Sequence, residues 1–232
     1  MTSMLRDEVL RGQYRAGERL PSERDLCMRF NVSRGAVREA LKQLQQLGIV
    51  SIQPGGARVV PIEECTLDVL GPLLDLNDPP DPKLVDEVMH LMGVLMREAA
   101  TAAIEKANEE DLRDADRIID AILAAKHDHV RQFEAFRKFG DFYVDLADHL
   151  VLRLLANSLR TTFMARLDPH DPVMRLDPDS IGSPVRRIRK ALAARDSTEL
   201  GGAMESLNRL FRDTVREAVK GNAGRSIRRS DR

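Results

Sequence analysis

The side chains best placed for chemistry lie in a short basic stretch near the N-terminus. Ser33-Arg34-Gly35-Ala36 opens a predicted helix, and Arg38 follows one turn later. Arginine donates bidentate hydrogen bonds to guanine in the major groove of DNA, and a helix start with a serine hydroxyl suits a phosphate. Gly35 and Ala36 are small enough to let the helix approach base edges. This stretch favours contact with double-stranded DNA, although an ordinary solvated helix face has the same periodicity.

Two short helices are expected to hold that stretch in place. Ser22 and Asp25 have the spacing of a capping box, so a helix is predicted to start at Ser22. A tight turn and a second helix, over residues 33–47, follow. The second helix carries apolar residues at helical spacing, namely Val37, Ala40, Leu41 and Leu44. Gly48 then stands where a glycine commonly ends a helix.

A hairpin is predicted directly after these helices. Two β-prone runs, residues 49–52 and 57–60, flank a tip that is rich in glycine. With a short helix over residues 2–11, this order of elements is typical of a winged helix-turn-helix DNA-binding domain. The tip at Gly55 is thin enough to enter a minor groove, and Arg58 stands near its base. We therefore assign residues 1–62 to this domain.

Composition limits the remaining possibilities. The 232 residues include no Trp, two Tyr and seven Phe, which favours helices because strands are enriched in aromatic residues. The net charge is only −1, but residues 1–62 hold ten Lys or Arg against six Asp or Glu, so nucleic-acid contact is expected there. No transmembrane run, secretory signal, disulfide framework or nucleotide-binding or catalytic motif is present. We expect a soluble, cytoplasmic protein that neither enters a membrane nor acts as an enzyme.

The rest of the chain predicts a linker followed by a bundle of helices. Residues 63–82 contain four prolines and are assigned to the linker. Residues 83–221 are assigned to an all-helical domain of six to seven helices that binds an effector and dimerises, and residues 222–232 to a disordered tail. The predicted helices cover residues 83–106, 109–125, 130–167 with a break near Asp148, 184–195 and 197–219, with a loop over 168–183. The fold class is mainly α.

Three stretches carry a resemblance to a known family. They are Leu20-Pro-Ser-Glu-Arg-Asp-Leu26, Val32-Ser-Arg-Gly-Ala-Val-Arg-Glu-Ala-Leu41 and Leu47-Gly-Ile-Val50. They are similar to the DNA-binding domain of GntR-family transcription regulators. The resemblance implies DNA contacts at Arg24, Ser33, Arg34, Ala36, Arg38 and Gly55, with Arg24 on a phosphate and Arg34 and Arg38 reading bases. It also implies a homodimer on a palindromic operator. The chain starts closer to its first helix than many members do, so that helix is expected to be truncated.

A weaker pattern, Ala107-Asn-Glu-Glu-Asp-Leu112 and Ala191-Leu-Ala-Ala-Arg-Asp196, occurs in the helical part. It resembles the FadR subfamily, whose effector domain is a helical bundle known as the FCD fold. Many such domains hold a divalent metal through an Asp-x3-His pair and two later histidines. The matching positions here are Phe136, Gly140, Val185 and Leu207, so neither a metal nor another cofactor is expected. Asp145 and His149 have the same spacing and form the alternative pair.

Without a metal, an apolar effector site is predicted within the bundle. Met89, Met92 and Met96 follow one face of its first long helix, and Phe139 and Tyr143 lie on the central one. Methionine with aromatic rings can line a site for a hydrophobic ligand, and the same residues can equally serve as core. We expect a DNA-binding regulator, a repressor, controlled by a small molecule such as a metabolite acid or acyl compound. The alternatives are a helical domain that only dimerises, or metal-dependent effector binding.

Overall fold

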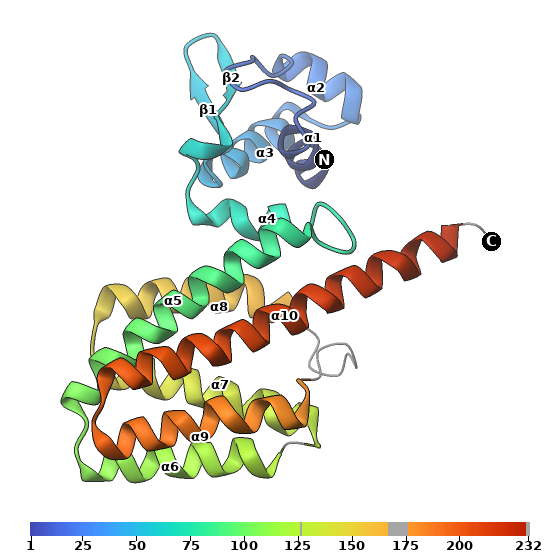
Figure 1. Ribbon diagram of the computed structural model, residues 1–232. Helices are drawn as coiled ribbons and strands as arrows, with labels where there is room; N and C mark the ends of the chain where they lie inside the picture. The colour runs from blue at the N-terminus through green and yellow to red at the C-terminus, as the bar shows by residue number, and fades with distance from the viewer. Residues whose placement is uncertain (126, 167–175, 231–232) are drawn as a thin grey trace. The chain divides into compact units, whose positions relative to one another are not determined.

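The computed structural model describes residues 1–125, 127–166 and 176–230. The chain divides into two compact units, Met1–Asp78 and Pro79–Arg232. The first unit contains three helices, a small two-stranded sheet and then three short helical segments, whereas the described part of the second unit is built from helices (Figure 1). This confirms the predicted fold class, which is mainly α with a winged helix-turn-helix followed by a helical bundle.

In the first unit, three helices precede a hairpin. They are α1 (Thr2–Leu10), α2 (Glu23–Phe30) and α3 (Arg34–Gln46), followed by β1 (Val50–Gln53) and β2 (Gly56–Val59). The strands pair antiparallel, with Val50 opposite Val59. All five elements contribute to one apolar core, which includes Leu5, Val9, Leu26, Val37, Leu41, Leu44, Val50 and Val59. The packing of α3 against this core leaves its opposite side facing solvent.

Local signals in the sequence start and end these helices as predicted. Ser22 Oγ accepts a hydrogen bond from Asp25 N at 3.2 Å, and Asp25 Oδ2 accepts one from Ser22 N at 3.3 Å. This is the predicted capping box at the start of α2. Asn31 ends α2 in the left-handed conformation, with φ 51°. Gly48 follows α3 with φ 76°, where a side chain would be strained.

The prediction of a linker over residues 63–82 is wrong for most of its length. Short helices η1 (Ile62–Glu64), η2 (Leu67–Val69) and α4 (Leu70–Leu74) occupy this segment, and Val69 belongs to the core of the first unit. Pro72 does not prevent α4 because it lies in the first turn, where a backbone N–H has no helical partner. The two units divide between Asp78 and Pro79, not at residue 62.

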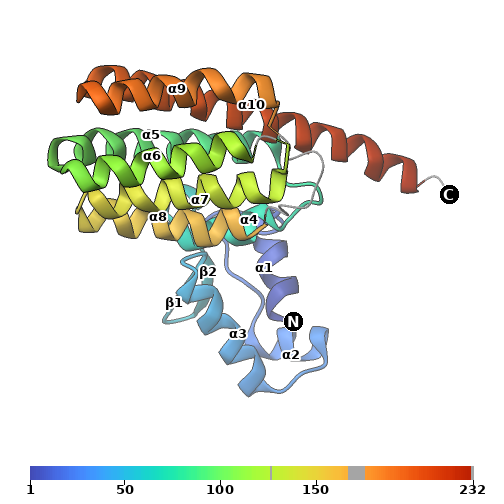
Figure 2. The same cartoon turned by 90° about the horizontal axis from the view of Figure 1, so that it is seen from below.

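Six long helices form the described part of the second unit. They are α5 (Pro82–Lys106), α6 (Glu109–Ala124), α7 (His129–Leu146), α8 (Leu150–Phe163), α9 (Pro178–Ala194) and α10 (Ser197–Ser230), with η3 (Met164–Arg166) after α8. Helix α5 packs against α7, α8 and α10, and α6 packs against α7 and α9 (Figure 2). Their inward side chains form a second core, which includes Ala100, Ile104, Ile119, Ile122, Phe139, Tyr143, Leu152, Val185, Ile188, Leu200, Met204 and Leu207.

Capping residues also set the limits of these helices. Asn108 and Asp111 form a capping box at the start of α6. Asp148 has φ 48° and separates α7 from α8, which is the predicted break. Asp177 caps α9 and Pro178 occupies its first position, so α9 begins before the end of the loop predicted over residues 168–183. Residues 168–175 of that loop, and residue 167 before it, lie outside the described residues.

The predicted disordered tail, residues 222–232, is wrong over residues 222–230, because α10 extends to Ser230. Each residue added to an existing helix gains a hydrogen bond without a new nucleation cost, so Gly221 and Gly224 do not end it. Residues 231–232 lie outside the described residues. Among the described helices, none is both long and apolar enough to cross a membrane.

Candidate DNA-binding surface

The N-terminal half of α3 presents a basic surface to solvent. Val37 is fully buried, whereas Arg34, Gly35, Ala36 and Arg38 are exposed. Because the apolar side is held in the core, the basic side is fixed in direction. The structure therefore brings the predicted contact residues of this helix together on one exposed surface at its start.

Ser33 caps α3, and this limits what its hydroxyl can do. Its Oγ accepts a hydrogen bond from Ala36 N at 3.3 Å. The hydroxyl proton stays available to donate to a phosphate oxygen, and the helix start adds the partial positive charge of the helix dipole. Ser33 thus fits a phosphate contact together with its structural role as a cap.

Arg38 is held by a residue of the neighbouring helix. Its Nε lies 3.0 Å from both carboxylate oxygens of Glu23, the first residue of α2. This hydrogen bond raises the pKa of Arg38 above its ordinary value, so the guanidinium stays charged at any physiological pH. Arg24 and Arg34 are also exposed, and neither has an ion pair with any residue that the structure describes.

The hairpin forms the wing predicted from the sequence. Gly55 and Gly56 make its tip with φ 105° and 127°, a conformation that favours glycine at both positions. Arg58 is exposed on β2, and its Nη1 donates to the carbonyl oxygen of Gly17 at 2.9 Å. Arg58 therefore ties the loop before α2 to the wing, and a contact with DNA stays a prediction for this side chain.

Arg19 is a basic residue of the wing region that sequence reasoning missed. It lies beside β2 in an isolated bridge with Arg58, and it is exposed. A Cβ added to Gly56 would come within 2.7 Å of Arg19 Nε, so the guanidinium lies directly against the tip of the wing. Gly55 and Gly56 predict a backbone with positive φ at the tip of the wing. The spacing of residues does not show that the side chain of Arg19, distant in sequence, lies against this tip.

Arg29 of α2, by contrast, makes contacts that stabilise the fold of the first unit. Arg29 donates to Glu8 of α1 and, at 2.9 Å, to the hydroxyl of Tyr14. Its guanidinium also stacks over Phe30, 5.0 Å from the ring centre. These contacts join α1 to α2 and take Arg29 out of the set of free cations.

In the helical unit, the five predicted effector residues do not form one cluster. Phe139 and Tyr143 are buried in the core with ring centres 4.9 Å apart, and Met96 packs against that core. Met89 is buried and Met92 is partly buried, but neither belongs to this core cluster. The structure thus joins three of the five residues, and an effector contact stays a prediction for all of them.

Two polar atoms in this core lack hydrogen-bond partners among the described residues. They are the hydroxyl of Tyr143 and Nε2 of Gln132, whose side chains are 1% and 3% exposed. Burial raises the pKa of Tyr143, and the nearby charge of Asp116 adds to the effect, so the hydroxyl stays protonated. An unpaired buried polar group costs about 1–3 kcal/mol, which makes each atom a candidate partner for a bound molecule.

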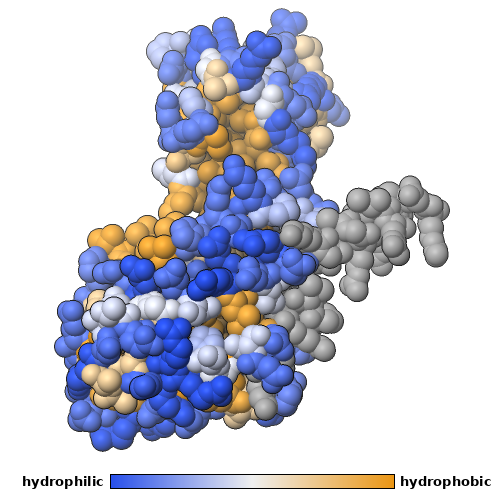
Figure 3. Space-filling model, viewed as in Figure 1, coloured by the Kyte–Doolittle hydropathy of each residue, from blue (hydrophilic) through white to orange (hydrophobic). Residues whose placement is uncertain are grey.

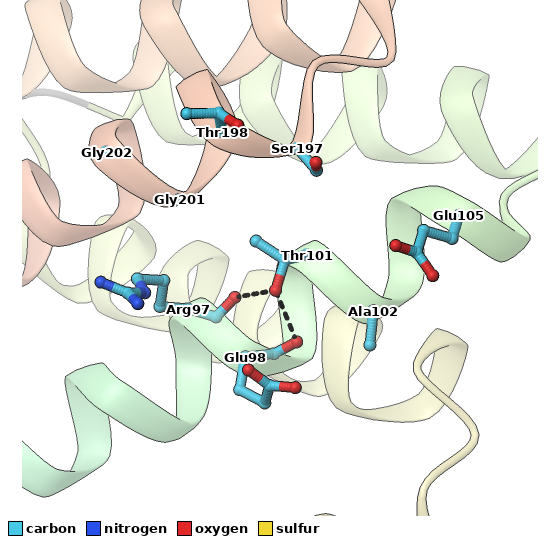
Figure 4. A pocket seen from close by; sticks show the side chains of 9 residues that line it. All are labelled: Arg97, Glu98, Thr101, Ala102, Glu105, Ser197, Thr198, Gly201 and Gly202. Atoms are coloured by element: carbon cyan, nitrogen blue, oxygen red, sulfur yellow. Dashed lines mark hydrogen bonds between the residues drawn. The ribbon is translucent and has the colours of Figure 1, made fainter.

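A surface groove of about 440 Å³ lies between α5 and the start of α10 (Figure 4). Its lining is mostly polar and consists of Arg97, Glu98, Thr101, Ala102, Glu105, Ser197, Thr198, Gly201 and Gly202. The hydroxyl of Thr101 bonds back to the carbonyl oxygens of Arg97 and Glu98. None of the five predicted effector residues lines this groove, so it is a separate feature of the unit.

The residues present do not fit the metal site of the resembled subfamily. Phe136 packs against the core, and Val185 and Leu207 are buried in it, so the matched positions offer no donor atoms. The alternative pair, Asp145 and His149, interacts with other groups of the protein. Asp145 lies 3.6 Å from Arg153, and Nδ1 of His149 accepts a hydrogen bond from Leu152 N at the start of α8. Across the described residues, no three His, Cys, Asp or Glu side chains gather in a way that could hold a metal ion.

A capped recognition helix, a preceding helix and a two-stranded wing define a winged helix-turn-helix DNA-binding protein. The model of "Bacterial regulatory proteins, gntR family" matches residues 2–60. The HTH-type transcriptional regulator Mce2R of Mycobacterium tuberculosis is 30% identical over 222 residues, which cover 94% of this chain and 91% of that protein. The chain therefore belongs to the GntR family of bacterial transcription regulators. It is a DNA-binding regulator and not an enzyme.

Two further comparisons agree with this assignment. The galactonate operon transcriptional repressor of Escherichia coli is 26% identical, over 64% of this chain and 66% of that protein. Among solved structures, the GntR protein of Streptococcus agalactiae superposes with a TM-score of 0.51 at 17% identity, over 92% of this chain and 100% of that one. The second comparison supports the fold.

Proposed function

We propose that this protein is a homodimeric repressor of the FadR subfamily that binds a palindromic operator and responds to a small molecule in its helical unit. The exposed, rigidly held start of α3 carries the proposal. It presents Arg34 and Arg38 on one side while the other side is buried. A helix of this kind fits the major groove, where arginine recognises guanine.

Binding to DNA is divided among three groups of residues. Arg34 and Arg38 read base edges, Arg24 and Ser33 contact phosphates, and Gly35 with Ala36 allows close approach. At the wing, Gly55 enters the minor groove, where Arg19 and Arg58 add positive charge. The capped helix start and the glycine tip support this division, because both bring the backbone close to the DNA.

Exposed apolar side chains on the helical unit support the homodimer. On α8, Leu150, Val151 and Leu154 are 69%, 59% and 59% exposed, and on the adjacent α5, Leu91 and Val94 are 42% and 49% exposed. Figure 3 shows apolar residues gathered where α8 lies in Figure 1. A contiguous patch of this kind marks an interaction site, and a second copy of the chain would cover it.

An effector in the helical unit would meet the core around Met96, Phe139 and Tyr143. The unpaired hydroxyl of Tyr143 favours a ligand with one hydrogen-bonding group beside an apolar body, such as an acyl compound. Met89 and Met92 would take part through a rearrangement of α5. Binding would change operator affinity by favouring one arrangement of the two DNA-binding units.

Operator selection tests the DNA-binding part of the proposal. The wild-type protein is used to enrich duplexes from a random library, and the affinity of Arg34→Ala and Arg38→Ala is measured on the enriched duplex. Each change is expected to cost about 1–3 kcal/mol of binding free energy and to relax the preference at one base pair. Arg113→Ala, which removes an exposed arginine of α6, is the control for net charge. Unchanged affinity in both α3 variants would contradict the assignment of α3.

Native mass spectrometry tests the remaining parts. The purified protein is expected to appear as a dimer that carries a small molecule which denaturation releases. Removing that molecule, or adding it in excess, is expected to change affinity for the enriched duplex. A dimer without ligand whose affinity no metabolite alters would favour the helical unit as a dimerisation scaffold alone.

A further inference from the structure

We propose that Glu23 is a specificity-determining residue, whose carboxylate orients the guanidinium of Arg38 for base recognition. The inference rests on the proposed function of α3 and extends it to a residue of α2. Glu23 is an acidic side chain at the edge of a surface that must meet phosphates, so its presence there needs a physical reason.

The geometry of the pair leaves the recognition groups of Arg38 available. Both carboxylate oxygens of Glu23 lie 3.0 Å from Nε, the nitrogen nearest the aliphatic stem. No hydrogen bond from Nη1 or Nη2 of Arg38 to another described residue is present. A guanidinium can offer these two groups together to O6 and N7 of guanine. The carboxylate of Glu23 therefore fixes the guanidinium through Nε, and Nη1 and Nη2 of Arg38 remain available to donate to a base.

Both members of the pair stand on fixed elements. Glu23 is the first residue of α2, and the capping box of Ser22 and Asp25 determines where that helix begins. Arg38 follows the fully buried Val37 on α3. The orientation of Arg38 is thus set by two helix positions of the folded unit and not by the flexible arginine stem alone.

Stability and simple affinity do not explain the pair. The Arg38 and Glu23 side chains are 66% and 39% exposed, and an exposed ion pair contributes little to folding. A carboxylate near DNA also repels phosphates and so weakens sequence-independent binding. A tethered guanidinium, however, has already lost side-chain freedom before it meets the base, and it is kept from swinging to a nearby phosphate. Both the lost freedom and the restricted swing increase the difference in binding affinity between the operator and other DNA.

The experiment compares Glu23→Gln with Glu39→Gln. Glu39 is an exposed carboxylate of α3 without an ion pair among the described residues, so its change removes the same charge from the same unit. Dissociation constants are measured for the duplex that the wild type enriches from a random library and for a mixed-sequence duplex of equal length. The specificity is the dissociation constant for the mixed-sequence duplex divided by the dissociation constant for the enriched duplex.

Glu39→Gln is expected to tighten binding to both duplexes by the same factor and leave the ratio unchanged. Glu23→Gln is expected to tighten binding to mixed-sequence DNA but to lower the ratio by about three- to tenfold, the range for immobilising one long side chain. A repeated selection with this variant should lose preference at the base pair that Arg38→Ala also relaxes. In the Arg38→Ala background, Glu23→Gln should not lower the ratio further.

Glu23→Asp provides a second test that retains the charge. Its carboxylate is one methylene shorter, so the ratio should fall without a gain in mixed-sequence affinity. The inference is overturned if Glu23→Gln changes both affinities equally, or if it lowers the ratio by the same factor without Arg38. A wild type that enriches no sequence would instead reject the proposed function, so the two failures are distinguishable.

Discussion

At the scale of single residues, the arginines of the first unit divide by what the folded protein does with them. Glu8 and Tyr14 hold Arg29, the carbonyl oxygen of Gly17 holds Arg58, and Glu23 orients Arg38. The count of basic residues in the sequence therefore overstates the charge that is free to meet phosphates. Arg24 keeps that freedom within the described structure, and as the proposed phosphate contact it should contribute to the salt dependence of binding.

The two tyrosines lead to opposite predictions for stability. Tyr143→Phe removes a buried hydroxyl that has no partner among the described residues, so it is expected to raise the free energy of unfolding of the ligand-free helical unit by up to about 1 kcal/mol. Tyr14→Phe removes the acceptor of an Arg29 hydrogen bond and should lower the stability of the first unit by about 0.5–1.5 kcal/mol. Urea unfolding of both variants measures this, and a loss of stability in Tyr143→Phe would show that its hydroxyl has a partner.

At the scale of the elements, α5 packs against α10 at Gly93. A Cβ at this position would overlap the side chain of Asn208 on α10. Gly93→Ala is therefore expected to destabilise the helical unit by about 1–3 kcal/mol, despite the better helix propensity of alanine. Adding Asn208→Ala removes the overlap, so the double variant should unfold at a higher temperature than Gly93→Ala alone. Thermal melts followed by circular dichroism test this, and the absence of rescue would contradict the assigned contact.

An ion-pair network joins the same two helices and predicts a pH dependence. Asp86 of α5 accepts hydrogen bonds from Arg212 at 2.7 Å and Arg216 at 2.8 Å. These bonds lower the pKa of Asp86 from 3.8 to about 2. The pair therefore stabilises the fold above about pH 4, and this contribution is lost as the pH falls toward 2. After solvent screening it should amount to roughly 1–2 kcal/mol. Asp86→Asn should remove the corresponding part of the acid unfolding curve, while Glu105→Gln, at an exposed carboxylate of α5 outside this network, serves as the control.

The extent to which the sequence predicts these elements follows from how local each signal is. Capping boxes, apolar periodicity and the glycine tip act within a few residues, so α2, α3, α6 and the wing were predictable. The fold of residues 62–74 onto the first unit depends on the distant core around Val69, which no local pattern shows. The Arg38–Glu23 and Arg19–Gly56 contacts likewise join residues 15 and 37 positions apart, so spacing could not reveal them. The core positions of Phe139 and Tyr143 followed from periodicity, but the separation of Met89 from them did not.

At the scale of the whole molecule, the exposed side chains of α8 predict the assembly state. Leu154→Lys places a charge within the apolar patch, where a second copy would have to bury it. The variant is expected to sediment as a monomer and to lose affinity for a full palindrome much more than for a half-site. Ala121→Lys, at an exposed position of α6, adds the same charge elsewhere and should remain dimeric. A dimeric Leu154→Lys protein would place the interface on another surface.

The distribution of aromatic residues also has a spectroscopic consequence. The chain has no tryptophan, and each unit contains one tyrosine, Tyr14 in the first and Tyr143 in the second. Intrinsic emission therefore comes from one known position per unit. In Tyr14→Phe the emission reports on the bundle interior alone, and in Tyr143→Phe it reports on the junction of α1 and α2. The order in which the two units open during denaturation can then be recorded without any attached dye.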